Sequence, residues 1–113
     1  MKIVKDKIEL KELKEMALNS FGNLVKAVVD VENEIMAVDA ELHSDEEALL
    51  LTNGSKQKDL WGINLYPEFE GEPFIEFDSM INIRPSQGNR TRGVDDPEIR
   101  DKIKIIVNKL VIK

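Results

Sequence analysis

The spacing of hydrophobic residues changes several times along this chain, and each spacing predicts one secondary-structure element. Within Glu9–Asn19 the apolar residues recur every three or four positions and charged residues fill the rest, which predicts an amphipathic helix. Leu24–Val31 is apolar at odd and even positions alike, as in a central strand covered on both faces. Ile35–Leu42 follows a short polar turn, and we expect it to form the antiparallel partner.

A second helix is predicted after this hairpin from a capping pattern. In Ser44-Asp45-Glu46-Glu47 the Ser44 hydroxyl would cap the helix, and Glu47 would reach back to the cap. Ala48–Leu51 would form the short helix, and Asn53-Gly54 would end it. The same Asn-Gly pair is also a signal for a hairpin turn. We predict the helix, because the Ser-Asp-Glu-Glu run is poor strand material.

Two more strands and a long helix complete the pattern. Leu60–Tyr66 and Phe74–Arg84 alternate apolar with polar residues, which is typical of strands with one buried face. The final helix begins at Asp95 or Asp96, either of which is a good N-cap, with Pro97 in its first turn. Its buried stripe consists of Ile99, Ile103, Ile106 and Leu110.

These elements predict a single α+β domain over residues 1–113. The consecutive strands are joined too tightly for parallel crossovers, so we expect a mainly antiparallel sheet of four to five strands, with Lys2–Lys5 as a short edge strand. Two or three helices would pack on one face of this sheet, which gives a two-layer sandwich.

The composition agrees with a folded protein and excludes several kinds of chemistry. Of the 113 residues, 42% are hydrophobic and 34% are charged, which is enough apolar surface to offset the entropy of the chain. The chain has no cysteine, and therefore no disulfide and no thiolate ligand or nucleophile. No stretch approaches the roughly 18 apolar residues of a membrane span, and Met1–Asp6 does not resemble a signal peptide. We therefore expect a cytoplasmic protein with no membrane partner.

The net charge of −6 is distributed unevenly along the chain. Residues 1–83 carry a net charge of −10, and residues 84–113 carry +4. A net acidic protein is repelled by a polyanion, so we expect no binding to duplex DNA. All four arginines lie within residues 84–100, whereas eight of the twelve lysines lie before residue 84, which points to a local use of the planar guanidinium group.

The segment 84–94 contains the main candidate binding site. Three arginines stand on or beside a polar loop there, and a glycine lies just before the last helix. Arginine forks and free N–H groups at a helix N-terminus both favour an anion, such as the phosphate of a nucleotide or small metabolite. Two residues on the polar side of a strand would flank this anion. The predicted ligand-binding residues are Arg84, Arg90, Arg92, Gly93, Asn64 and Tyr66.

In an alternative interpretation, the same arginines pair with carboxylates inside the fold and brace the loop. The protein would then be a structural or protein-interaction module. Ile105 and Ile112 lie off the buried stripe of the last helix, so the apolar surface of this helix is wider than one sheet face requires. A homodimer would use that surface for its contact.

A third interpretation is a hydrolase or transferase. Asp39, Glu41 and His43 share one face of their predicted strand, and carboxylates on a neighbouring strand would make His43 a general base. Any solvated strand face produces the same alternation of polar residues. The sequence contains no metal-binding or cofactor motif, and we predict neither a metal nor a cofactor.

Three stretches of the chain carry a family resemblance. They are AVDAELHSD (Ala37–Asp45), LWGINLYP (Leu60–Pro67) and MINIRPSQGNRTRG (Met80–Gly93). Together they resemble a family of small prokaryotic proteins that is catalogued only as a domain of unknown function. The resemblance covers nearly the whole chain and implies a prokaryotic cytosolic protein. It implies no activity, cofactor or catalytic residue, so the function has to be argued from the residues themselves.

Overall fold

Five strands form one antiparallel sheet in the computed structural model, which describes all residues 1–113. Their spatial order is β1-β4-β3-β5-β6, so the central strand β3 pairs with β4 on one side and β5 on the other. The strands are β1 (Lys2–Val4), β3 (Val25–Asp30), β4 (Ile35–Val38), β5 (Leu60–Leu65) and β6 (Ile75–Glu76). The prediction of an α+β protein with an antiparallel sheet is confirmed.

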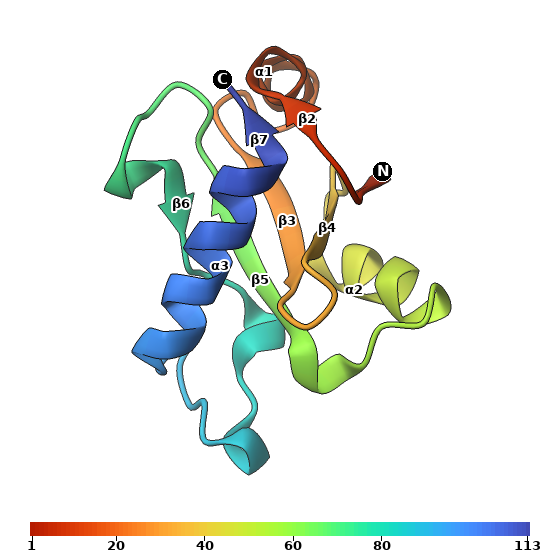
Figure 1. The fold of residues 1–113 in the computed structure, drawn as a ribbon, viewed down its shortest axis with the longest axis vertical. Helices are drawn as coiled ribbons and strands as arrows, with labels where there is room; N and C mark the ends of the chain where they lie inside the picture. The colour runs from red at the N-terminus through yellow and green to blue at the C-terminus, as the bar shows by residue number, and fades with distance from the viewer.

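Three helices and several short elements complete the fold (Figure 1). The helices are α1 (Leu10–Asn19), α2 (His43–Thr52) and α3 (Pro97–Leu110). Two short strands, β2 (Ile8–Glu9) and β7 (Val111–Ile112), pair in parallel and join the two ends of the chain. Single 3₁₀ turns lie at Gln57–Asp59, Glu72–Phe74, Met80–Asn82 and Pro85–Gln87.

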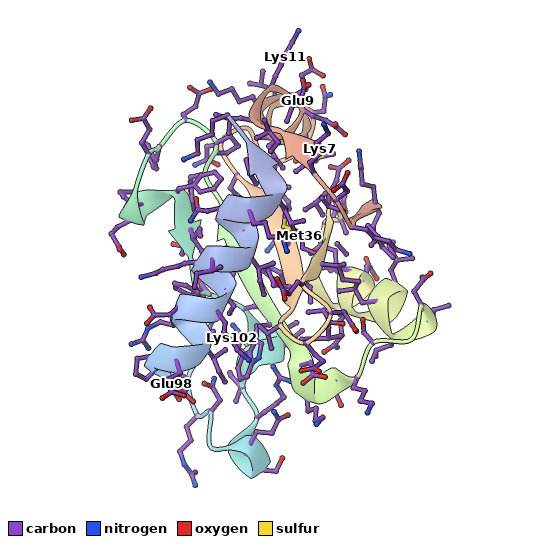
Figure 2. All side chains as sticks on the ribbon, viewed as in Figure 1. Lys7, Glu9, Lys11, Met36, Glu98 and Lys102 are labelled. Atoms are coloured by element: carbon purple, nitrogen blue, oxygen red, sulfur yellow. The ribbon has the colours of Figure 1, made fainter.

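The main core lies between one face of the sheet and the helices α1 and α3. Ala27 and Val29 project from the central strand into this core, where they meet Leu13 of α1 and Ile103 of α3. Figure 2 shows Met36 in the space between α3 and the strands, while charged side chains such as those of Lys11 and Glu98 lie at the periphery. The apolar stripes of α1 and α3 are therefore buried against the sheet, as their spacing predicts.

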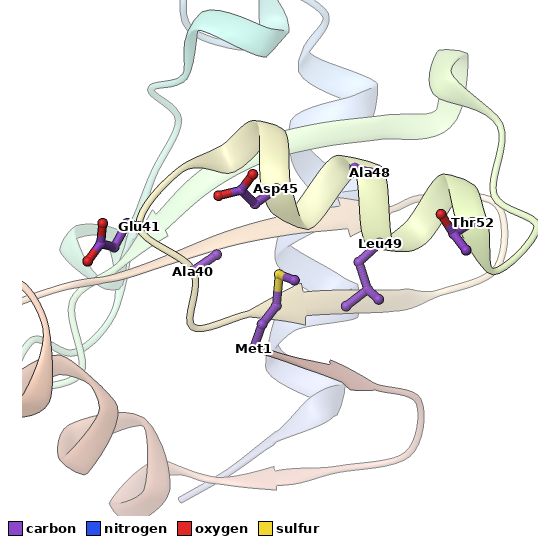
Figure 3. A pocket seen from close by; sticks show the side chains of 7 residues that line it. All are labelled: Met1, Ala40, Glu41, Asp45, Ala48, Leu49 and Thr52. Carbon is purple, nitrogen blue, oxygen red and sulfur yellow. The ribbon is translucent and has the colours of Figure 1, made fainter.

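Helix α2 covers the opposite face of the sheet. Val28 of the central strand and Ala37 of β4 pack there against Leu50 of α2, in a second and smaller apolar cluster. In Figure 3, α2 lies in front of the strands and α3 lies behind them. The expectation that all helices pack on one face is therefore wrong, because the sheet has helices on both faces. The sequence signal for this arrangement is that Leu24–Val31 has apolar residues at odd and even positions alike.

The strand predicted over Phe74–Arg84 is wrong beyond β6, because the chain enters the 3₁₀ turn Met80–Asn82 instead. The side chain of Asn82 takes the place of the missing strand. Its Oδ1 accepts a hydrogen bond from the Gly62 N–H at 2.8 Å, and its Nδ2 donates to the Gly62 carbonyl oxygen at 2.9 Å. An asparagine amide offers one acceptor and two donors, so it satisfies this part of β5 as a neighbouring backbone would.

Helix α2 is confirmed as a helix, but it is longer than predicted and begins earlier. It starts at His43, which places Ser44 in the first turn, and the N-cap position is Leu42 without a side-chain cap. The predicted capping box is therefore wrong. At the other long helix, Asp96 rather than Asp95 is the N-cap, and its side chain accepts from the N–H of Glu98 at 2.9 Å.

The two isoleucines considered for a homodimer contact are both exposed. Ile105 retains 66% of its surface and Ile112 retains 46%. The homodimer itself stays a prediction. None of the three helices combines the length and the apolar composition that a membrane span needs.

Candidate functional site

Arg84, the first arginine of the predicted site, is used within the fold. Its guanidinium group donates to the carbonyl oxygen of Gln57 at 2.5 Å and to that of Leu60. The same group stacks over the ring of Trp61, 4.2 Å from the ring centroid. These contacts tie the segment after β6 to the beginning of β5. Both terminal nitrogens and one face of the Arg84 guanidinium group therefore already have partners within the protein.

One carboxylate caps the N-terminus of α3, and a second one is engaged by the loop that precedes it. Asp95 accepts from the N–H of Arg90 at 2.9 Å and from the hydroxyl of Thr91 at 2.5 Å, and these hydrogen bonds lower the pKa of Asp95. Asp96 caps the first turn. The N–H of Gly93 donates to the Thr91 hydroxyl at 3.2 Å. The Arg90 side chain is exposed and forms no hydrogen bond or ion pair.

Two buried asparagines fix the loop between these positions. The Asn89 amide donates to the carbonyl oxygens of Asn82 and Gly93, both at 2.8 Å, and accepts from the N–H of Asp95 at 2.7 Å. The Asn82 amide donates to the carbonyl oxygen of Arg92 at 2.9 Å. The backbone of Arg92 is therefore held in place although it belongs to a surface loop.

Arg92 lies at a polar pocket of about 230 Å³ on the same side of the sheet as α2. The pocket forms where the first residues of α2 meet strands β3 and β5 and the segment that follows β6. We call it the α2 pocket. It is lined by Lys26, Leu42, His43, Ser44, Asn64, Asp78, Ser79, Met80, Ile81 and Arg92.

His43 is held in the α2 pocket as a neutral ring. Its Nε2 lies 2.7 Å from the Ile63 carbonyl oxygen, which only accepts, so Nε2 carries the proton and Nδ1 is left without a partner. Burial is the main reason that the pKa of His43 is lowered, and the charges of Lys26 and Arg92 lower it further. The Ile63 hydrogen bond and the charge of Asp78 act in the opposite direction but do not outweigh burial.

Two cations reach the α2 pocket from distant parts of the chain. Lys26 comes from β3, forms no ion pair, and has its ammonium group 5.3 Å from the ring centroid of Phe21. Arg92 uses its Nε to contact Asp78 Oδ1 at 2.7 Å, and its two terminal nitrogens have no partner. The lining therefore contains two cations and one carboxylate.

Asn64 lines the pocket opposite Lys26, with which it is paired across the two strands. Its Nδ2 donates to Glu76 Oε1 at 2.8 Å, while its Oδ1 is buried and has no hydrogen-bond partner. Tyr66 also donates to Glu76 Oε1, at 3.0 Å, and stacks on Phe69. Burial raises the pKa of Tyr66, and the carboxylate of Glu76 raises it further. Neither Tyr66 nor Glu76 lines the pocket, and Tyr66 is linked to Asn64 only through their shared acceptor Glu76.

Asp39 and Glu41, the carboxylates predicted on the same strand face as His43, lie outside the α2 pocket, whereas Asp78 lines it. β4 ends at Val38, and Asp39 adopts a left-handed conformation with φ 71°, so the expected alternation stops there. Glu41 lines a different and larger cavity of about 510 Å³ between α2 and the N-terminal residues (Figure 3). That cavity is lined by Met1, Ala40, Glu41, Asp45, Ala48, Leu49 and Thr52. It contains two carboxylates and no lysine, arginine or histidine side chain, so it suits an anion less well than the α2 pocket does.

Of the predicted site residues, the structure brings three together in the α2 pocket. The pocket contains Arg92 and Asn64, which belong to the predicted anion site, and His43, which belongs to the hydrolase or transferase interpretation. The other predicted residues lie outside its lining; they are Arg84, Arg90, Gly93, Tyr66, Asp39 and Glu41. The sequence reasoning missed Lys26, for which a signal exists: it is a lysine inside a central strand whose only other charged residue is Asp30, at its end. No group of three or more histidines and carboxylates is placed to hold a metal ion.

The comparisons with known proteins place the chain in a family without assigning it a function. A family model described as "Protein of unknown function (DUF5674)" matches residues 2–110, and the chain belongs to this family. Neither the curated proteins nor the solved structures contain a significant match.

Proposed function

We propose that this protein is a small binding module that receives a phosphate group in the α2 pocket. The observation that carries the proposal is the convergence of Lys26 and Arg92 on a pocket with a single carboxylate, in a chain of net charge −6. Lysines and arginines that serve only solubility do not need to gather around a cavity. An ammonium group without an ion-pair partner gains most from an anion there.

The first turn of helix α2 favours the same ligand. The first N–H groups of a helix have no helical acceptor, and the aligned peptide dipoles make that end of the helix positive. Leu42, His43 and Ser44 form this end and all line the pocket. His43 is neutral, so it adds no charge, but its unpartnered Nδ1 would accept a hydrogen bond from a hydroxyl on the bound group.

The proposed site differs from the loop tip that the sequence favours. Asp96 caps the N-terminus of α3, Asp95 accepts from the N–H of Arg90, and Arg84 donates to backbone carbonyl groups. Arg92 is the arginine that keeps free donors beside a cavity. Arg90 has free donors as well, but it does not line the pocket, which makes it a matched control.

A titration with inorganic phosphate, followed by two-dimensional NMR, tests the proposal. We expect saturable shifts at Lys26, residues 42–44, Asn64 and Arg92. Arg92→Gln and Lys26→Met should each weaken binding about tenfold, because a hydrogen bond to a charged group contributes about 1.5–3 kcal/mol. Arg90→Gln removes the same charge from the same loop and should change the affinity by less than about twofold.

Two outcomes would contradict the proposal. One is the absence of any saturable shift around the pocket. The other is an equal loss of affinity in Arg90→Gln and Arg92→Gln, because this would show attraction to the general positive charge of the loop rather than binding in the pocket. The spectra of all variants should remain well dispersed, since the three side chains contribute little to the core.

A further inference from the structure

Two exposed hydrophobic side chains stand at the rim of the α2 pocket. Leu42 keeps 58% of its surface exposed and Met80 keeps 65%, and both line the pocket together with the cations. We propose, on the basis of the phosphate site above, that the natural ligand is a phosphate monoester whose organic part is apolar or aromatic. The phosphate would sit by Lys26 and Arg92, and the organic part would pack on Leu42 and Met80.

The two rim side chains come from different elements, and each is presented by local backbone structure. Leu42 is the extended N-cap residue of α2, with φ −127° and ψ 137°. Met80 begins a 3₁₀ turn whose N-cap, Ser79, is buried and accepts from the N–H of Ile81. Because Ser79 is buried on one side of this turn, Met80 remains on the outside. A scattered exposed leucine needs no explanation, but two apolar side chains beside one cationic pocket form a combined surface.

The size of the pocket supports a ligand with two parts. Sites that enclose a drug-sized molecule usually have volumes of roughly 300–1,000 Å³, and the α2 pocket has about 230 Å³. It therefore holds a phosphate group and the first part of a substituent, but not a whole drug-sized molecule. The rest of the substituent would extend to the rim, where Leu42 and Met80 are the apolar side chains that it meets. Methionine is flexible and polarisable, and it packs well against aromatic rings.

A comparison of two probes by isothermal titration calorimetry tests this inference. Phenyl phosphate and inorganic phosphate share the charged group, and only phenyl phosphate carries a ring. We expect phenyl phosphate to bind at least about tenfold more tightly to the unaltered protein, since burial of part of a ring against apolar side chains is favourable.

A double variant and its control locate the effect. Leu42→Ala with Met80→Ala should remove the preference for phenyl phosphate and leave the affinity for inorganic phosphate within about twofold, because alanine keeps the backbone N–H groups of the helix end and adds no capping hydroxyl. Leu18→Ala with Ile105→Ala changes two residues that are at least as exposed, at 75% and 66%, and lie outside the pocket lining, so the preference should persist. All four positions are on the surface, and both double variants should fold.

The outcomes separate this inference from the proposed function. Equal affinity for the two probes would overturn the inference and leave the phosphate site intact. The same is true if the preference survives in the Leu42 and Met80 variant. If neither probe binds, the proposed function fails together with the inference.

Discussion

Glu46 is a carboxyl group in an apolar setting, one turn into helix α2. Its side chain has no exposed surface; Oε2 accepts from the N–H of Ala40 at 3.1 Å, and Oε1 has no partner. Burial raises the pKa of Glu46 from 4.5 to about 9, and the hydrogen bond from Ala40 offsets only part of this rise. The carboxyl group is therefore protonated in the folded protein at neutral pH, whereas it is ionised in the unfolded chain.

This difference predicts a pH dependence of stability with a definite sign. Between pH 4.5 and about 9 the folded protein keeps a proton that the unfolded chain has lost. The contribution of Glu46 to the free energy of unfolding is then fully present below pH 4.5 and falls as the pH rises, by up to about 1.4 kcal/mol per pH unit. Glu46→Gln cannot ionise, so it should be more stable than the unaltered protein at pH 8, with a much smaller difference at pH 5.

Urea denaturation at the two pH values measures this effect. Glu41→Gln, at a nearby exposed position, is the control and should change the unfolding midpoint little at either pH. If Glu46→Gln lowers the midpoint equally at pH 5 and pH 8, then Glu46 is an ionised acceptor in the folded protein and the argument is wrong.

Among single residues, the sequence identified only part of the candidate site. Arg92 stands out because arginines are concentrated in one segment, and His43 stands out as the only histidine. Their meeting could not be predicted, because it depends on α2 folding back so that the His43 ring reaches Ile63 on β5. Lys26 could not be singled out, because a charged residue within a mostly apolar strand does not reveal which face of the sheet is left uncovered by helices at that position.

At the level of elements, regular apolar periodicity gave correct predictions for most helices and strands but failed for one strand. The helices α1 and α3 and the strands β3 and β5 follow from apolar spacing, and their bounds agree within about two residues. The strand predicted over Phe74–Arg84 has the right alternation but not the right structure. Its backbone cannot run beside β5, because the Asn82 side chain takes the hydrogen bonds of Gly62.

Gly62 shows how closely this crossing segment approaches the strand. A Cβ atom built at Gly62 would lie 2.5 Å from Ser79 Cβ, far inside van der Waals contact, and Ser79 is itself buried. Glycine is therefore required by space rather than by its backbone angles. The sequence gives no sign of this requirement, since a glycine inside a strand has several explanations.

Gly62→Ala should therefore destabilise the protein. We expect the free energy of unfolding to fall by about 2 kcal/mol or more, because neither the strand nor the Ser79 turn can move without losing the Asn82 hydrogen bonds. Gly93→Ala is a fair comparison, since its new Cβ atom meets nothing closer than 3.4 Å, and it should cost clearly less. Equal urea midpoints for Gly62→Ala and the unaltered protein would contradict the packing described here.

For the molecule as a whole, helices on both faces of the sheet determine where a pocket can exist. Helices α1 and α3 completely cover one face of the sheet along the central strand, where the main core lies. Helix α2 is ten residues long and covers only part of the other face, with four buried residues in its cluster. The α2 pocket lies at the N-terminal end of this partial cover, so the polar residues of β3 and β5 remain accessible there.

The charge distribution of the whole molecule argues against duplex DNA as a partner. Binding to DNA requires several cations on one surface to displace counterions from the phosphates. Of the arginines in the basic segment, Arg84 and Arg100 donate to backbone carbonyl groups, and Arg92 is paired with Asp78. Only the Arg90 side chain has no partner, and the backbone N–H of Arg90 donates to the Asp95 carboxylate.

We therefore expect no binding of a random 20-base-pair duplex at physiological salt in a fluorescence anisotropy titration, even at protein concentrations of about 100 μM, where many non-specific DNA-binding proteins would be bound. The remaining residues, 1–83, carry a net charge of −10 and repel the duplex from most orientations. The same protein sample should still show the phosphate-induced shifts at Lys26 and Arg92, because a single small anion enters one pocket and does not meet the acidic surface. Saturable micromolar binding to the duplex would contradict this expectation. It would mean that Arg90 and Arg92 act with other cations as one extended surface, and that the α2 pocket is the edge of a nucleic-acid interface rather than a site for a small ligand.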